Sequence, residues 1–153
     1  MQGIRIYEMP DCRMVSSGTG QFGGEKLDGF AAWFSSLPQG IFPKDYLFWN
    51  GEGFEWLYLY EEGMDVPAGY KIVPFKGGLY AVATDIDQQT DMDAMAAEVD
   101  RFLAANGLER DPERPQLGNI ITSPAAREIL GYEQMDYYVP VRAQEGKGNN
   151  GNG

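Results

Sequence analysis

The stretch Gly53-Phe-Glu-Trp-Leu-Tyr-Leu-Tyr-Glu-Glu-Gly63 alternates large rings with other side chains between two glycines. This period of two predicts a β-strand over residues 54–61 with Trp56, Tyr58 and Tyr60 on one face. Tyrosine and tryptophan carry polar groups that need partners when buried, so a plain core usually prefers Val, Ile and Leu. Three such rings on one face therefore indicate either a core or the wall of a binding site.

Outward from this strand, the chain shows one order of elements twice. The clearest element is a helix that begins near Thr90, which is spaced from Asp93 as in a capping box, and ends before Gly107. In chain order, the predicted elements are strands at 4–8 and 13–17, a helix at 25–36, strands at 46–49, 54–61, 70–75 and 79–84, the helix before Gly107, and strands at 117–122 and 135–142.

The repeated order strand–strand–helix–strand–strand predicts an α+β fold, a duplicated βαββ unit with two antiparallel-sheet halves and one long helix in each. We expect a single domain over 1–142, with halves at about 4–66 and 70–142, and a disordered tail over 143–153 because of its composition. In each half the last strand begins with an acid followed by rings. If the halves pair about a pseudo-two-fold axis, these strands face each other across a central cleft, a common ligand site.

Charge and residue counts exclude several classes of function. Lys and Arg number 12 and Asp and Glu 23, which gives a formal net charge of −11. Such a chain repels phosphate backbones, so direct nucleic-acid binding is not expected. The chain has no histidine, which excludes histidine-based acid–base catalysis, Ser-His-Asp triads and the commonest zinc sites. We expect no metal ion and no cofactor.

The chain is expected to be cytoplasmic and to have no membrane partner. Its first residues lack the basic region and long apolar stretch of a signal peptide. No apolar run approaches the roughly 20 residues that span a bilayer. A lone cysteine, Cys12, cannot form an internal disulfide and suits a reducing compartment.

Several stretches resemble the GyrI-like small-molecule-binding domain, which is also the effector-binding domain of AraC-type regulators. The stretches are IRIYEMP (4–10) followed by RMVSSG (13–18), VPFKGGLYAV (73–82), the segment 98–107, and DYYVPV (136–141). Each motif is short, but their order and spacing together cover almost everything from residue 4 to residue 141.

The resemblance implies a duplicated βαββ fold whose central aromatic cleft binds drug-like, often cationic, organic molecules. Family members occur fused to DNA-binding segments, as stand-alone proteins that sequester toxins or inhibit gyrase, and as hydrolases of strained cyclopropane-containing drugs. We therefore expect a stand-alone binding protein or the effector-sensing half of a transcription regulator. Its expected partner is a small hydrophobic, cationic or amphipathic molecule, and relatives add a protein partner or a fused DNA-binding domain.

The family often places a glutamate in the strand after the second helix, where it meets the charge of the ligand. Here Asn119 stands near that position and supplies no charge, and Glu55 or Asp136 would take its place if either points into the cleft. Trp33 and Trp49 are left open between cleft and core. The expected ligand-binding residues are Trp56, Tyr58, Tyr80, Tyr137, Glu55, Asp136, Asn119, Trp33 and Trp49.

Two other functions stay open. As a hydrolase, the chain would use Glu55 as its acid, with Tyr58 or Tyr137 as orienting donors. As an acidic protein-interaction module resembling a gyrase inhibitor, it would use the acidic run over 85–93. The alternative for that run is a solvated loop followed by a helix N-terminus.

Overall fold

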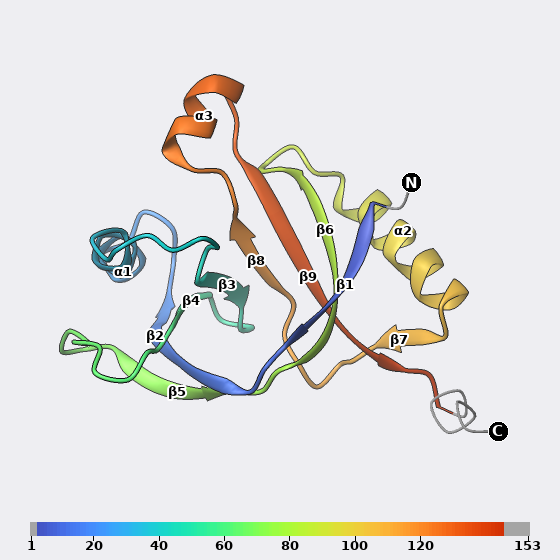
Figure 1. Cartoon of the computed structure of the whole chain (residues 1–153), viewed down its shortest axis with the longest axis horizontal. Coiled ribbons are helices and arrows are strands. Elements are labelled where there is room, and N and C mark those ends of the chain that lie inside the picture. Colours follow the sequence, from blue (N-terminus) through green and yellow to red (C-terminus); the bar gives the residue numbers. More distant parts are fainter. Residues whose placement is uncertain (1–2, 146–153) are drawn as a thin grey trace.

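The computed structural model describes residues 3–145, which form nine strands and three helices (Figure 1). Their bounds are β1 Ile4–Met9, β2 Cys12–Gly20, α1 Glu25–Ser35, β3 Asp45–Trp49, β4 Phe54–Leu59, β5 Lys71–Phe75, β6 Gly78–Ile86, α2 Met92–Ala105, β7 Leu108–Arg110, β8 Leu117–Ile120, α3 Pro124–Leu130 and β9 Gln134–Ala143. Most of the predicted tail lies outside the described residues. Gln144 is described, and its backbone N–H donates to the carbonyl of Gly107 at 2.9 Å.

The strands pair antiparallel in the order β1-β6-β9-β8-β3-β4-β2-β5, and β7 pairs with β9. This order is symmetrical about the junction of β8 and β3, because β8, β9 and β6 on one side correspond to β3, β4 and β2 on the other. The outermost strands are exchanged between the sides: β1 pairs with β6, and β5 pairs with β2. The predicted α+β class is confirmed, and the repeated element order is present with β7 and α3 added to the second half.

The two exchanged connections, β1 to β2 and β5 to β6, touch at Gly77. Its backbone N–H donates to Oδ1 of Asp11 at 2.8 Å. A Cβ atom at Gly77 would lie 2.0 Å from the carbonyl oxygen of Met9 and 2.5 Å from the carbonyl carbon of Pro10. Both atoms belong to backbone, so no side-chain movement could make room, and the crossing requires a glycine.

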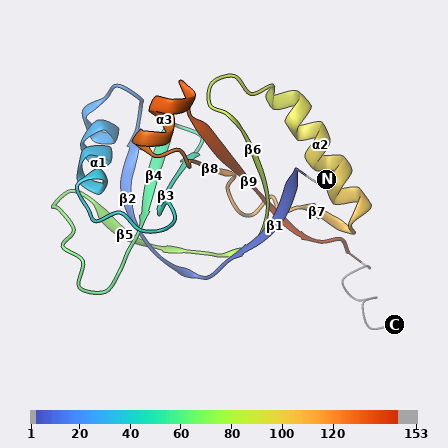
Figure 2. The ribbon, with the colours of Figure 1, turned by 45° about the horizontal axis from the view of Figure 1, so that its top comes forward.

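Helices α1 and α2 lie on the same face of the sheet. Directly paired residues share a face, and along a strand every second residue does. Tyr137 of β9, on the face covered by α2, pairs with Gly118 of β8. Gly118 pairs with Leu47 of β3, and Leu47 pairs with Trp56 of β4, so all four residues share that face. Tyr58, two residues after Trp56, is on the same face and pairs with Val15 of β2, which packs against α1. Figure 2 shows the two helices at opposite ends of the sheet. We call this surface the helix face.

The opposite face of the sheet buries a core of its own. It brings together residues from β1, β2, β4, β5, β6, β8 and β9, among them Met14, Leu57, Tyr80 and Tyr138. Strands from both ends of the sheet contribute to this one cluster, so the sheet curls around it. We call this surface the inner face. Its side chains come from the residues that alternate with those under the helices.

Local details differ from the sequence predictions at three places. The N-cap of α2 is Asp91, whose side chain accepts from the N–H of Ala94, and not Thr90, whose hydroxyl donates to the carbonyl of Ile86. Strand β7 and helix α3 were not predicted. Helix α3 has Ser123 as N-cap and the left-handed Gly131 at its end. Among residues 3–145, no helix is both long and apolar enough to cross a membrane.

Candidate functional site

A strip of the helix face lies between the two long helices. Helix α1 packs on β2 and β4, and α2 packs on β6 and β7, whereas β3 and β8 occupy the centre of the sheet between them. Figures 1 and 2 show the helices flanking this centre, with α3 projecting beside it. The strip follows from the strand order, and it is where the predicted central cleft falls. Its residues are Asp45, Leu47 and Trp49 of β3 and Gly118 and Ile120 of β8.

A pocket of about 560 Å³ opens at the end of this strip where β3 begins. Its size falls within the range of small-molecule sites, roughly 300–1,000 Å³. It lies between the end of α1, the segment 39–44 and the segment 120–124 that leads into α3. Its lining residues are Phe34, Ser35, Gln39, Gly40, Ile41, Phe42, Pro43, Lys44, Asp45, Tyr58, Ile120, Ile121, Thr122, Ser123 and Pro124.

Asp45 is the carboxylate of this pocket, and the sequence analysis did not single it out. It is the first residue of β3 and lies opposite Tyr58 and beside Trp56 of β4. Its Oδ2 accepts a hydrogen bond from Nε1 of Trp56 at 3.1 Å. Burial raises the pKa of Asp45, and the indole N–H opposes that rise only in part. The site therefore holds a partly desolvated carboxyl group among aromatic rings.

The rings beside Asp45 form a continuous wall between β4 and α1. Phe34 of α1 stacks on Tyr58 with ring centroids 5.5 Å apart and an interplanar angle of 21°. The Phe34 ring also contacts Trp56 edge-on, with centroids 5.2 Å apart. Trp33 contacts Tyr58 edge-on at 5.8 Å. These contacts fix the ring orientations, so the wall is formed before any ligand arrives.

Lys44 also lines the pocket, and its charge is already paired. Its Nζ donates to Oε1 of Glu61 at 2.7 Å, and this hydrogen bond raises the pKa of Lys44. The pair leaves Asp45 as the remaining charged group on the pocket wall when its carboxyl is ionised. The local field therefore favours a cation over an anion.

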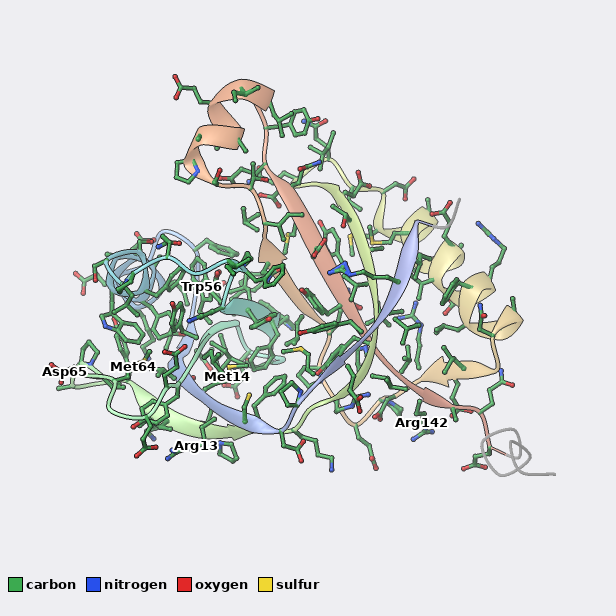
Figure 3. All side chains as sticks on the ribbon, viewed as in Figure 1. Arg13, Met14, Trp56, Met64, Asp65 and Arg142 are labelled. Atoms are coloured by element: carbon green, nitrogen blue, oxygen red, sulfur yellow. The ribbon has the colours of Figure 1, made fainter. Side chains whose placement is uncertain are left out.

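The structure brings some of the predicted site residues together on the helix face. Trp33, Trp56 and Tyr58 belong to the aromatic wall, and Figure 3 labels Trp56 beside α1. Tyr137 is on the same face in β9, where its hydroxyl lies 3.1 Å from Oγ1 of Thr90. Trp49 lies at the far end of β3, is 54% exposed and contacts Phe54. Their roles in ligand binding stay a prediction.

The other predicted residues lie on the inner face. Glu55 accepts from Oγ of Ser16 at 2.6 Å, and Ser16 in turn accepts from the N–H of Gly18, so Glu55 supports an irregular stretch of β2. Asp136 is buried; it accepts from Arg5 at 3.2 Å and from Thr84.

Asn119 and Tyr80 are also buried in the inner face. In the part of the chain that the structure describes, the Oδ1 of Asn119 and the hydroxyl of Tyr80 have no hydrogen-bond partner. Arg114 lies over the Tyr80 ring at 4.8 Å. Neither residue lines the pocket at Asp45.

The expectation that Glu55 or Asp136 supplies a charge to the aromatic wall does not fit this geometry. Each acid directly precedes a ring that faces the helices, Trp56 in one strand and Tyr137 in the other. Neighbouring residues of a strand point to opposite faces, so neither acid can share the face of the ring that follows it. The structure offers Asp45 in their place.

Comparison with known proteins shows relatives in structure only. No protein-family model and no curated protein matches the sequence. A hydrolase from Listeria innocua superposes with a TM-score of 0.63 at 13% identity, over 92% of each chain. The C-terminal domain of EcmrR superposes with a TM-score of 0.61 at 10% identity, over 92% of this chain and 97% of that domain.

A third similar structure is SAV2435 bound to tetraphenylphosphonium. Its TM-score is 0.52 at 11% identity, over 92% of this chain and 94% of that one. A further similar structure shows EcmrR in a complex with DNA. This chain matches 57% of the length of that EcmrR chain. At these identities the matches show that the fold is shared. Membership of the GyrI-like family stays a prediction.

Proposed function

We propose that this chain binds a small hydrophobic organic cation in the pocket at Asp45. The observation that carries the proposal is the partly desolvated Asp45 carboxyl beside the wall of Phe34, Tyr58 and Trp56. The cation would supply the counter-charge that Asp45 lacks. Ring faces add roughly 0.5–2 kcal/mol of attraction for a cation, more when water is excluded.

Two similar structures support a role in sensing or sequestering such a ligand. One, SAV2435, is bound to tetraphenylphosphonium, a bulky aromatic cation, and another is the C-terminal domain of a protein that also occurs in a DNA complex. The proposal for this chain is accordingly a stand-alone binding protein or the effector-sensing half of a regulator, in the manner of the GyrI-like domains. The net charge of −11 disfavours direct contact between this chain and DNA.

A hydrolase is the second candidate, and the raised pKa of Asp45 favours it. A carboxyl group that keeps its proton nearer to neutral pH is a better general acid for a strained leaving group. Two of the similar structures are hydrolases from Listeria innocua. Turnover of a cyclopropane-fused dienone, followed by its ultraviolet absorbance and lost in Asp45→Asn, would favour this candidate. A ligand recovered unchanged favours binding.

A pair of isosteric probes tests the binding proposal. The cation (4-hydroxyphenyl)trimethylammonium and the neutral 4-tert-butylphenol have the same shape and differ in charge. We expect saturable calorimetric binding of the cation at pH 7 and weaker binding of the phenol. Equal binding of the two would refute a charged site, and binding of neither would refute the pocket as a site for this class of ligand.

A further inference from the structure

The pocket at Asp45 changes character from its inner wall to its mouth. The inner wall carries the carboxyl group and the rings of Tyr58 and Phe34. The outer part is lined by the exposed Ile41 and Phe42 of the segment before β3, and the segment 120–121 lines the pocket as well. Both residues of that second segment are isoleucines. A ligand that fills the pocket therefore meets the carboxyl group at the inner wall and exposed apolar side chains at the mouth.

The side chains at the mouth are unusually exposed for their size. Ile41 is 92% exposed and Phe42 is 77% exposed, and they are two of the three most exposed large hydrophobic side chains among residues 3–145. The third is Ile129 of α3, at 85%. Adjacent exposed apolar residues mark a binding surface more often than isolated ones do. Here the surface is continuous with a pocket, which argues for a tail of the same ligand.

The charges around the pocket decide what the head of such a ligand carries. Asp45 disfavours an anionic head, and the Lys44 ammonium is held by Glu61 at 2.7 Å. A carboxylate head would approach both the ionised Asp45 and the Glu61 partner of Lys44 with like charge. A cationic head meets neither obstacle.

We infer that the pocket selects single-chain cationic amphiphiles, with the cationic head at Asp45 and an alkyl tail over Ile41, Phe42 and the two isoleucines at 120–121. This inference rests on the proposed function and narrows it from hydrophobic cations in general to those with a flexible tail. Each methylene that leaves water for this surface strengthens binding, because burial of apolar area is favourable in proportion to the area.

A chain-length series tests the inference. Alkyltrimethylammonium ions with tails of four to twelve carbons are titrated by calorimetry against the whole chain, below their micelle concentrations. Full burial of a methylene corresponds to about a fourfold gain in affinity, and the open mouth reduces this to between about two- and fourfold per methylene. We expect that slope to hold until the tail outgrows the mouth.

Two variants separate the head from the tail. The double substitution Ile41→Ser with Phe42→Ser is expected to flatten the slope and to leave tetramethylammonium binding unchanged. Asp45→Asn is expected to weaken every member of the series by one common factor. Ile72→Ser, at an exposed position on β5 away from the pocket, is the matched control and keeps the slope. Because these serines replace exposed side chains, we expect the variants to fold, and thermal unfolding checks this.

Three outcomes overturn the inference. A flat series in the wild type shows that the mouth holds no tail, and binding of short cations alone then leaves the proposed function standing. An unchanged slope in the double variant shows that the tail lies elsewhere. Dodecanoate or dodecanol binding as tightly as dodecyltrimethylammonium refutes the assigned charge of the head.

Discussion

Asp45→Asn is the substitution that isolates the charge of the pocket. Asparagine has the same shape and keeps an oxygen that can accept from the indole N–H of Trp56, whose Nε1 lies 3.1 Å from Oδ2 of Asp45. The substitution therefore removes the negative charge and leaves the aromatic wall in place. Any loss of affinity for a cation can be assigned to that charge.

The size of the loss follows from the position of the carboxyl group. Two unit charges 4 Å apart attract by about 4 kcal/mol at the effective dielectric constant of about 20 that suits a partly buried site. Desolvation of both groups and the open side of the pocket reduce this to about 1.5–3 kcal/mol, the usual value of a hydrogen bond or contact to a charged group. At 1.4 kcal/mol per tenfold, the affinity for the cation falls by about 10- to 150-fold.

Calorimetry with the isosteric probes at pH 7 measures this loss. We expect Asp45→Asn to lower the affinity for (4-hydroxyphenyl)trimethylammonium and to leave that for 4-tert-butylphenol within about twofold. Asp65→Asn removes the same charge from an exposed loop at the outer end of the molecule (Figure 3) and serves as the control. If Asp45→Asn binds the cation as tightly as Asp65→Asn does, the carboxyl group is not the counter-charge and the reasoning fails.

Four further predictions follow from the same structure. Because burial raises the pKa of Asp45, the affinity for a cation is expected to weaken as the pH falls through that raised pKa, which calorimetry from pH 7 down to 3.8, the ordinary pKa of an aspartate, measures. In the ligand-free protein the ionised Asp45 carboxyl lowers the free energy of unfolding, so Asp45→Asn should raise Tm at pH 7. This gain in Tm should vanish as the pH falls toward 3.8, the ordinary pKa of an aspartate. Asp136→Asn should lower the free energy of unfolding by about 1.5–3 kcal/mol in urea titrations and leave cation binding unchanged, because its partners lie on the inner face. Gly77→Ala should lower the free energy of unfolding by about 2 kcal/mol or more, whereas Gly3→Ala, with open space around its position, should leave it almost unchanged.

Each of these has an opposite result that counts against the structure. Cation binding independent of pH would mean that Asp45 is not the group that titrates at the site. A lower Tm for Asp45→Asn at pH 7 would mean that its charge is compensated by a partner. Weaker cation binding in Asp136→Asn would indicate that the cation binds on the inner face. A neutral Gly77→Ala would contradict the close approach of the two connections.

The order and type of most elements could be predicted because the spacing of apolar residues and the positions of glycine and proline indicate the same helices and strands along the chain. Helix α3 was missed although its signals are present: Ser123 suits an N-cap, Pro124 the first helical position, and Gly131 the end. The helix has no buried residue, so it lacks the apolar stripe that identified α1 and α2.

The charged residue of the site was the harder prediction. The sequence shows that an acid precedes the rings of β4 and β9, but alternation along a strand puts that acid on the other face. Asp45 reaches the aromatic wall across the β3–β4 pairing, in a register that places it opposite Tyr58. That register depends on the length of the turn between the strands and on the packing of both, which single-sequence periodicity does not determine.

Crystallography of the protein with bound tetraphenylarsonium locates the cation. Arsenic scatters anomalously, so a difference map locates the cation without a model of the ligand. We expect one strong peak on the helix face in the pocket at Asp45, within about 6 Å of the Tyr58 or Phe34 ring. A peak on the inner face beside Glu55 or Asp136, with the pocket at Asp45 empty, would contradict the proposed site.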